Sequence, residues 1–199
     1  DVEPRAEALS SAPPDFDPLA EVLRRAKGMR VIAWLNVFYV WSSKNFPPED
    51  SHVFWSLEDW ILKDRDGREV WTYSAQERAL SWLEGIYVDP ASKQYRARFA
   101  DLAAEVAAKY RVDGIHLDFV RYPGPGYGKG GPLGEEFRKL WGLDPRWLPT
   151  EFEAPSPAAL LDGAAAPSKR ALAAASFLWK DLRAAQVTAL VRDVRTKLN

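Results

Sequence analysis

The chain has 199 residues, 47% hydrophobic and 28% charged, which indicates one ordinary globular domain and excludes a disordered chain. With 27 basic against 28 acidic residues the formal net charge is -1, so composition gives no electrostatic case for nucleic acid or an anionic membrane as partner. No stretch approaches the roughly 18 consecutive apolar residues of a membrane span. The chain has no cysteine and two histidines, which excludes disulfides and disfavours a histidine-rich zinc site. We predict no metal and no other cofactor.

The aromatic content is unusual for a domain of this size. The chain contains 9 Trp, 7 Tyr and 9 Phe, together 13% of its residues. Flat aromatic rings suit the apolar C–H faces of sugars, and an indole adds one hydrogen-bond donor. A tryptophan-rich core would explain the same composition.

The first predicted elements are a short helix and a strand. Asp17 followed by Pro18 fits a helix N-cap with proline at the first helical position, and Gly28 marks the end of that helix. Residues 30–40 (RVIAWLNVFYV) form an almost unbroken apolar run. Such a run predicts a parallel strand buried on both faces.

A strand, a helix and a second strand follow later in the chain. Residues 85–88 read as a short strand, Asp89 before Pro90 repeats the N-cap pattern, and a helix with apolar residues at three-and-four spacing runs to about Tyr110. Residues 114–120 are the next strand, after a tight connection at Asp113. This order predicts a parallel crossover unit.

The remainder of the chain is irregular until a final helix. A helix is expected near residues 135–141, a turn at Asp144 and Pro145, and a long amphipathic helix over about 176–198. Residues 154–175, rich in Ala and Pro, are either a helical insertion or a flexible stretch. Residues 124–131 contain a G-x-G-x-x-G pattern, but we expect no helix N-terminus to follow it and so no dinucleotide site.

The two longest connections, residues 41–84 and 121–175, both follow strand ends, and such segments build the active sites of parallel α/β folds. We predict an α/β fold: a single domain over residues 1–199 of the (β/α) TIM-barrel type. The barrel is expected to be incomplete, because about three core parallel strands are visible and a closed barrel of this type takes about 250 residues.

The most informative stretch is residues 110–123 (YRVDGIHLDFVRYP). Alternation along the strand places Gly114, His116 and Asp118 on one face. An unpaired buried carboxylate is costly, so Asp118 requires either a partner or a chemical role, and an ion pair with Arg121 is the structural alternative. His116 is either a hydrogen-bonded core residue or part of the floor of a pocket.

Residues 112–123 (VDGIHLDFVRYP) resemble the signature of the glycosyl hydrolase-like family 10 proteins, bacterial barrel enzymes related to glycoside hydrolases. The segments FDPLA (16–20), VIAWLN (31–36) and GIYVDP (85–90), the Trp60 segment, and the last helix with Trp179 and Arg183 match in the same order. The resemblance covers most of the chain. It implies a TIM-type barrel with further strands before and after this chain, a secreted or periplasmic location, and hydrolysis of a bacterial polysaccharide such as cell-wall glycan.

Asp118 is the predicted catalytic carboxylate, as a nucleophile or as the base that activates water. Glycoside cleavage needs a second acid, for which Asp89 and Glu84 are candidates, although Asp89 is equally explained as a helix cap. The other alternative is a second acid on a strand beyond Asn199. The residues predicted to bind substrate are Trp34, Asn36, Trp41, Asp89, His116, Arg121 and Tyr122.

Each of these binding residues has a structural alternative. Trp34 could instead pack the core, and Arg121 and Tyr122 could instead pin the loop that follows the strand. Trp41, Trp55, Trp60, Trp71 and Trp82 lie in or beside the first long connection, where some would stack on polysaccharide and others would only pack the loop. The sequence thus predicts a glycosidase with a polysaccharide substrate. A non-catalytic carbohydrate-binding module and an inactive fragment of the enzyme are the alternatives, and the oligomeric state is left open.

Overall fold

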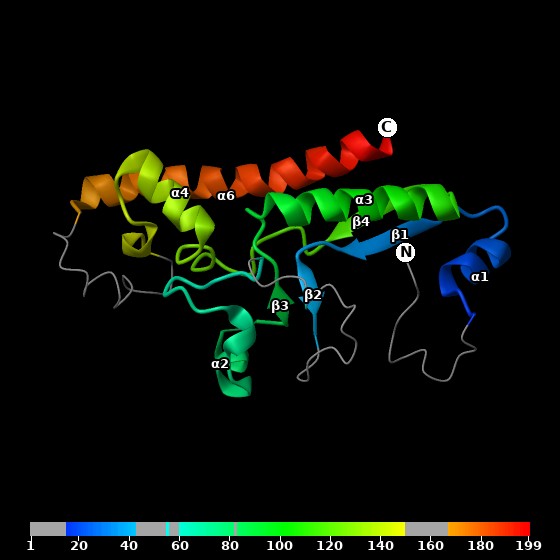
Figure 1. Ribbon diagram of the computed structural model, residues 1–199, viewed down its shortest axis with the longest axis horizontal. Coiled ribbons are helices and arrows are strands. Elements are labelled where there is room, and N and C mark those ends of the chain that lie inside the picture. The colour runs from blue at the N-terminus through cyan, green and yellow to red at the C-terminus, as the bar shows by residue number, and fades with distance from the viewer. Residues whose placement is uncertain (1–14, 43–54, 56–59, 82, 150–166) are drawn as a thin grey trace.

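The computed structural model describes residues 15–42, 55, 60–81, 83–149 and 167–199, and these form a mixed α/β structure (Figure 1). Its elements in chain order are α1 (Pro18–Arg25), β1 (Ile32–Asn36), β2 (Tyr39–Trp41), η3 (Val70–Thr72), α2 (Ala75–Leu80), β3 (Ile86–Tyr87), α3 (Lys93–Tyr110), β4 (Gly114–Asp118), α4 (Pro132–Trp141), η4 (Pro145–Trp147) and α6 (Lys169–Leu198). The α/β class is therefore confirmed, whereas the described residues contain no closed barrel.

The central sheet is the parallel pair of β1 and β4, as the sequence predicts. Ile32 is in register with Gly114 at one end, and Asn36 is in register with Asp118 at the other. Asp113 sets the start of this pairing, since its carboxylate accepts the Val31 N–H at 2.7 Å and its own N–H donates to the Val31 carbonyl at 2.8 Å. The two strands therefore end at the same edge of the sheet.

The strand predicted at residues 85–88 does not join this sheet. β3 pairs antiparallel with β2, Tyr39 opposite Tyr87, so the expected parallel crossover between residues 85–88 and β4 is wrong. The cause is that the chain leaves the β1–β4 sheet and joins the β2–β3 sheet within the apolar run at residues 30–40. At Val37 and Phe38 the chain still donates to the β4 side, through Asp118 and Phe119, but the Phe38 carbonyl already accepts the Val88 N–H at 2.8 Å.

The prediction that residues 30–40 are buried on both faces is also wrong for β1. Ala33 is buried beneath α3, whereas Ile32 is 50% exposed and Trp34 is 66% exposed. The two-stranded sheet therefore has one covered face and one open face.

The helices α3 and α6 lie side by side, and α3 packs against β4 of the sheet (Figure 1). α6 buries Ala175, Trp179, Leu190 and Val194. It begins seven residues earlier than the sequence predicts, so the C-terminal part of the 154–175 stretch is helical, while residues 154–166 lie outside the described residues. Across the described residues no helix is both long enough and apolar enough to cross a membrane.

The helix caps are only partly as predicted. Asp17 caps α1, accepting the Ala20 N–H at 3.0 Å. The predicted cap at Asp89 is wrong, because α3 begins three residues later, where the Ser92 hydroxyl accepts the Tyr95 N–H at 3.2 Å. Ser92 offers the same capping chemistry one turn closer to the regular helix.

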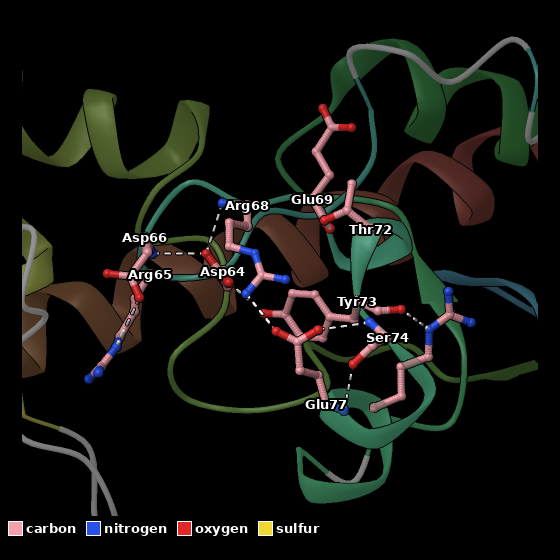
Figure 2. Close-up of polar contacts among 10 residues, drawn as sticks. Asp64, Arg65, Asp66, Arg68, Glu69, Thr72, Tyr73, Ser74 and Glu77 are labelled. Atoms are coloured by element: carbon pink, nitrogen blue, oxygen red, sulfur yellow. Dashed lines mark hydrogen bonds and ion pairs between the residues drawn. The ribbon is translucent and has the colours of Figure 1, made fainter.

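Residues 60–81 of the first long connection form a polar lobe (Figure 2). Asp64 organises it: one carboxylate oxygen accepts the N–H groups of Asp66 and Arg68, and the other accepts the Tyr73 hydroxyl at 2.5 Å. A capping box between Ser74 and Glu77 starts α2. Residues 60–81 are therefore a folded unit held by their own side chains.

The polar lobe docks on residues 124–131, which we call the glycine loop. The Gly128 N–H donates to the Lys63 carbonyl at 2.7 Å, and the Gly130 N–H donates to the Asp64 carbonyl at 2.9 Å. A Cβ at Gly130 would lie 2.3 Å from the Gly67 nitrogen and 2.6 Å from the Asp64 oxygen. Only glycine allows these two backbones to approach so closely.

We therefore expect Gly130→Ala to destabilise the chain by about 1–3 kcal/mol, because the added methyl group overlaps backbone that cannot move aside. Urea unfolding measures this loss. Gly124→Ala is the matched control in the same loop, because its Cβ would meet only the Tyr127 ring, at 3.4 Å. Equal stability of the two variants would show that the close approach at Gly130 is not a constraint.

Candidate functional site

Four of the predicted site residues lie in the carboxyl-terminal halves of β1 and β4: Trp34, His116 and Asp118 on the open face, and Asn36 at the end of β1 in register with Asp118. We call Trp34, Asn36, His116 and Asp118 the strand-end site. The Trp34 and His116 rings lie 4.6 Å apart, and the Trp34 indole N–H donates to Asp118 Oδ2 at 3.1 Å. Trp34 and His116 are exposed, so neither is a core residue. The site exists because alternate residues of paired strands share a face.

The Asp118 carboxylate has two hydrogen bonds, one on each oxygen. Besides the indole N–H, the Phe119 backbone N–H donates to Asp118 Oδ1 at 2.7 Å. Phe119 has φ of 49°, a left-handed conformation that is unfavourable for a residue with a side chain. Its ring stacks on Tyr39 with centroids 4.5 Å apart, which stabilises this turn. The strained turn therefore directs a backbone N–H at the carboxylate.

Arg121 does not pair with Asp118, so the alternative in which Asp118 forms an ion pair with Arg121 is wrong. The Arg121 guanidinium instead lies 3.4 Å from the Glu84 carboxylate, and both side chains are about half exposed. Glu84 also accepts the Tyr87 hydroxyl at 2.5 Å. Burial and this hydrogen bond raise the pKa of Tyr87 above its usual range. Arg121 and Glu84 are thus one surface pair beside β3.

The structure places Asp89 and Tyr122 in the interior, where neither reaches a polysaccharide bound at the surface. Asp89 is 3% exposed and Tyr122 is 9% exposed. They belong to a buried cluster between β3, α3, the loop after β4 and α6. Its members are Asp89, Arg96, Tyr122 and Arg183. The Arg183 guanidinium stacks over the Tyr122 ring at 4.2 Å and donates to the Gly124 carbonyl at 2.6 Å.

Asp89 is the electrostatic centre of this buried cluster. Its Oδ1 accepts the Ala91 N–H at 2.9 Å, and its Oδ2 is buried and accepts no hydrogen bond from any described residue. Burial raises its pKa from 3.8 to about 6; the Ala91 N–H, the Arg183 charge, the Tyr122 hydroxyl and the Arg96 charge oppose that rise. Burial likewise lowers the pKa of Arg183, against the influence of Tyr122 and Asp89.

Arg96 was not among the sequence-predicted site residues. It is 7% exposed, donates to the Pro90 carbonyl and to Gln186 Oε1 at 2.9 Å each, and lies 3.6 Å from the Asp193 carboxylate. An arginine on the apolar face of a helix is a detectable sequence signal, because such a charge requires buried partners. The side-chain partners of Arg96, Gln186 and Asp193, are on α6, about ninety residues further along the chain.

Most of the described tryptophans of the first connection pack inward. Trp41, on β2, is half-buried against the core, and so are Trp60 and Trp71. Trp55 is 43% exposed, and Trp82 lies outside the described residues. Trp41 therefore belongs to the core boundary and is not part of the strand-end site.

The glycine loop does run into a helix, contrary to the sequence prediction. α4 begins at Pro132 with Gly131 as its N-cap, and proline at the first position suits a helix start. A Cβ at Gly131 would lie 3.4 Å from Asp89 Oδ2, so this helix end faces a carboxylate of the chain itself. Within the described residues no three His, Cys, Asp or Glu side chains gather as metal ligands would.

The comparisons with known proteins give no relative. The chain matches no protein-family model, and neither the curated proteins nor the solved structures contain a significant match to it. The resemblance to the glycosyl hydrolase-like family 10 proteins therefore stays a prediction from the motif residues. The case for function depends on the geometry of the site.

The raised pKa of Asp89 predicts a specific pH dependence of stability. Between about pH 4 and 6 the folded chain holds a proton on Asp89 that the unfolded chain has released, so stability falls as the pH rises through 6. The slope attributable to Asp89 is on the order of 1 kcal/mol per pH unit. Denaturant unfolding at several pH values measures it.

Asp89→Asn removes the titrating group and should flatten this part of the profile. Asp15→Asn, at an exposed position, should leave the profile unchanged. A profile that keeps its full slope in Asp89→Asn would mean that Asp89 does not titrate in this range.

Proposed function

We propose that the chain is part of a glycoside hydrolase in which Asp118 is the catalytic carboxylate and the strand-end site binds the sugar. One observation carries the proposal. A tryptophan in β1 that is 66% exposed donates its indole N–H to the aspartate that ends the neighbouring parallel strand β4. An exposed apolar ring beside a carboxylate suits a substrate that has both an apolar face and hydroxyl groups.

The proposed fold is a (β/α) barrel in which β1 and β4 are neighbouring strands. Three features support it: the pair is parallel, α3 covers one face, and the polar side chains gather where the strands end. In barrels of this type the outer face packs on helices, and catalytic residues stand at the carboxyl ends of strands. The open face that carries Trp34 and Asp118 would then line the barrel interior.

The chemistry follows from the hydrogen bonds of Asp118. Each carboxylate oxygen accepts one hydrogen bond and keeps further lone-pair capacity, so the group is oriented and still free to act. It would attack the anomeric carbon as a nucleophile or take a proton from the attacking water. Asn36 at the end of β1 and His116 on the open face would bind sugar hydroxyls.

This mechanism also needs a second carboxylic acid, to protonate the leaving group. Asp89 is too buried to contact a substrate, which leaves Glu84 as the exposed candidate of the two that the sequence suggests. Glu84 is held by Arg121 and Tyr87, and the hydrogen-bond partners of Asp118 among the described residues, the Trp34 indole and the Phe119 backbone, include no acid. This observation favours a second candidate function, a carbohydrate-binding module that uses the Trp34 and His116 rings without catalysis.

Asp118→Asn should reduce glycan hydrolysis by about 10²–10⁴-fold while glycan binding persists, because the amide keeps the shape of the carboxylate but cannot act as nucleophile or base. Release of reducing ends from solubilised cell-wall glycan measures hydrolysis. Asp181→Asn, on the exposed side of α6, should retain full activity. Undiminished hydrolysis by Asp118→Asn would overturn the assignment, and binding without hydrolysis by the original chain would favour the binding module.

Trp34→Ala should weaken glycan binding about tenfold, because the stacking surface and the indole N–H are both lost. Calorimetric titration with the same glycan measures this. Phe177→Ala is the matched control, since Phe177 is 70% exposed on α6, away from the strand-end site. Equal loss in both variants would indicate nonspecific adsorption to exposed aromatic rings.

A further inference from the structure

A cavity of about 300 Å³ lies between the β1–β2 segment and α3. Asn36, Tyr39 and Val40 line it from the strands, and Tyr95, Arg98, Phe99 and Leu102 line it from the helix. This volume is at the lower end of the range for small-molecule sites. Its walls are largely apolar and aromatic.

Two polar side chains that line the cavity have no partner. The Asn36 amide and the Arg98 guanidinium are both exposed to solvent, and neither forms a hydrogen bond or ion pair with any residue in the described part of the chain. Arg98 is the only charged residue of the lining, and its charge acts to lower the pKa of Tyr95, which burial raises more strongly. The cavity therefore offers one cation and one amide to a ligand.

The two tyrosine hydroxyls of the lining are already used. Tyr39 donates to the Glu84 carbonyl at 3.4 Å, and Tyr95 donates to the Val37 carbonyl. A polyhydroxylated sugar in this cavity would therefore find few partners for its hydroxyl groups, and leaving them unpaired is costly. A ligand with one anionic group and an apolar body matches the available groups better.

We propose that this cavity binds a small carboxylate with an apolar body about the size of one ring. Arg98 and Asn36 donate to the carboxylate, and the body packs on Tyr39, Phe99 and Leu102. A guanidinium suits this role because its planar donors match the two carboxylate oxygens. The site is distinct from the strand-end site in its ligand chemistry and does not depend on glycan hydrolysis.

The two sites are nevertheless coupled by position. Asn36 ends β1 in register with Asp118, and it lines the cavity as well. A carboxylate held by the Asn36 amide would therefore engage a side chain of the strand-end site itself.

The test is titration of the isotopically labelled chain with 3-phenylpropionate, followed by NMR at the Asn36 side-chain amide and the Phe99 and Leu102 backbone amides. These signals should shift saturably. Arg98→Met keeps the aliphatic stem but removes the charge, and it should weaken binding about tenfold or more, since a charge-assisted hydrogen bond is lost. Arg192→Met, at an exposed position of α6, is the matched control and should bind as the original chain does.

Two further ligands test the chemistry of the site. The neutral analogue 3-phenylpropanol should bind about tenfold more weakly than the acid, and glucuronate, an anion covered with hydroxyls, should not shift the cavity signals. Equal binding of the acid by the original chain and Arg98→Met would overturn the proposal. Shifts of the cavity signals by glucuronate as large as those by 3-phenylpropionate would also overturn it.

Discussion

The parallel pairing of β1 with β4, covered on one face by α3, is the constraint on which the rest of the structure depends. Pairing in register brings Asn36 and Asp118 to the same edge of the sheet. Covering only one face sends Ala33 into the interior and leaves the Trp34 indole exposed beside the Asp118 carboxylate. An apolar ring and a carboxylate become neighbours because strands alternate their side chains. The proposed sugar chemistry follows from this placement.

The change of sheet at Val37 and Phe38 gives the molecule its second feature. Both side chains are fully buried, and the backbone there is shared between β4 on one side and β3 on the other. Because β1 ends where β2 begins, Asn36 stands at the boundary between the strand-end site and the cavity beneath α3. One break in an apolar run therefore separates two surfaces of different chemistry.

The buried cluster has a different role from the strand-end site. Asp89 lies beneath α6 with two arginines whose charges oppose the pKa rise that burial causes. Arg96 and Arg183 connect it to α3 and α6, so this charge arrangement joins the two long helices behind the sheet. Removing either partner of such a cluster leaves the other charge buried, which makes it a structural unit.

The sequence by itself determined the features set by short-range rules. Alternation along residues 114–118 placed His116 and Asp118 on one face, and the Asp17 and Pro18 pair identified the start of α1. Only the tertiary structure decided that Asp89 and Tyr122 are interior, that β3 pairs antiparallel, and that Trp34 is exposed. Local periodicity records which residues share a face, but not what covers that face. Whether Asp89 caps a helix or enters a buried cluster depends on Arg183, ninety-four positions away in the chain.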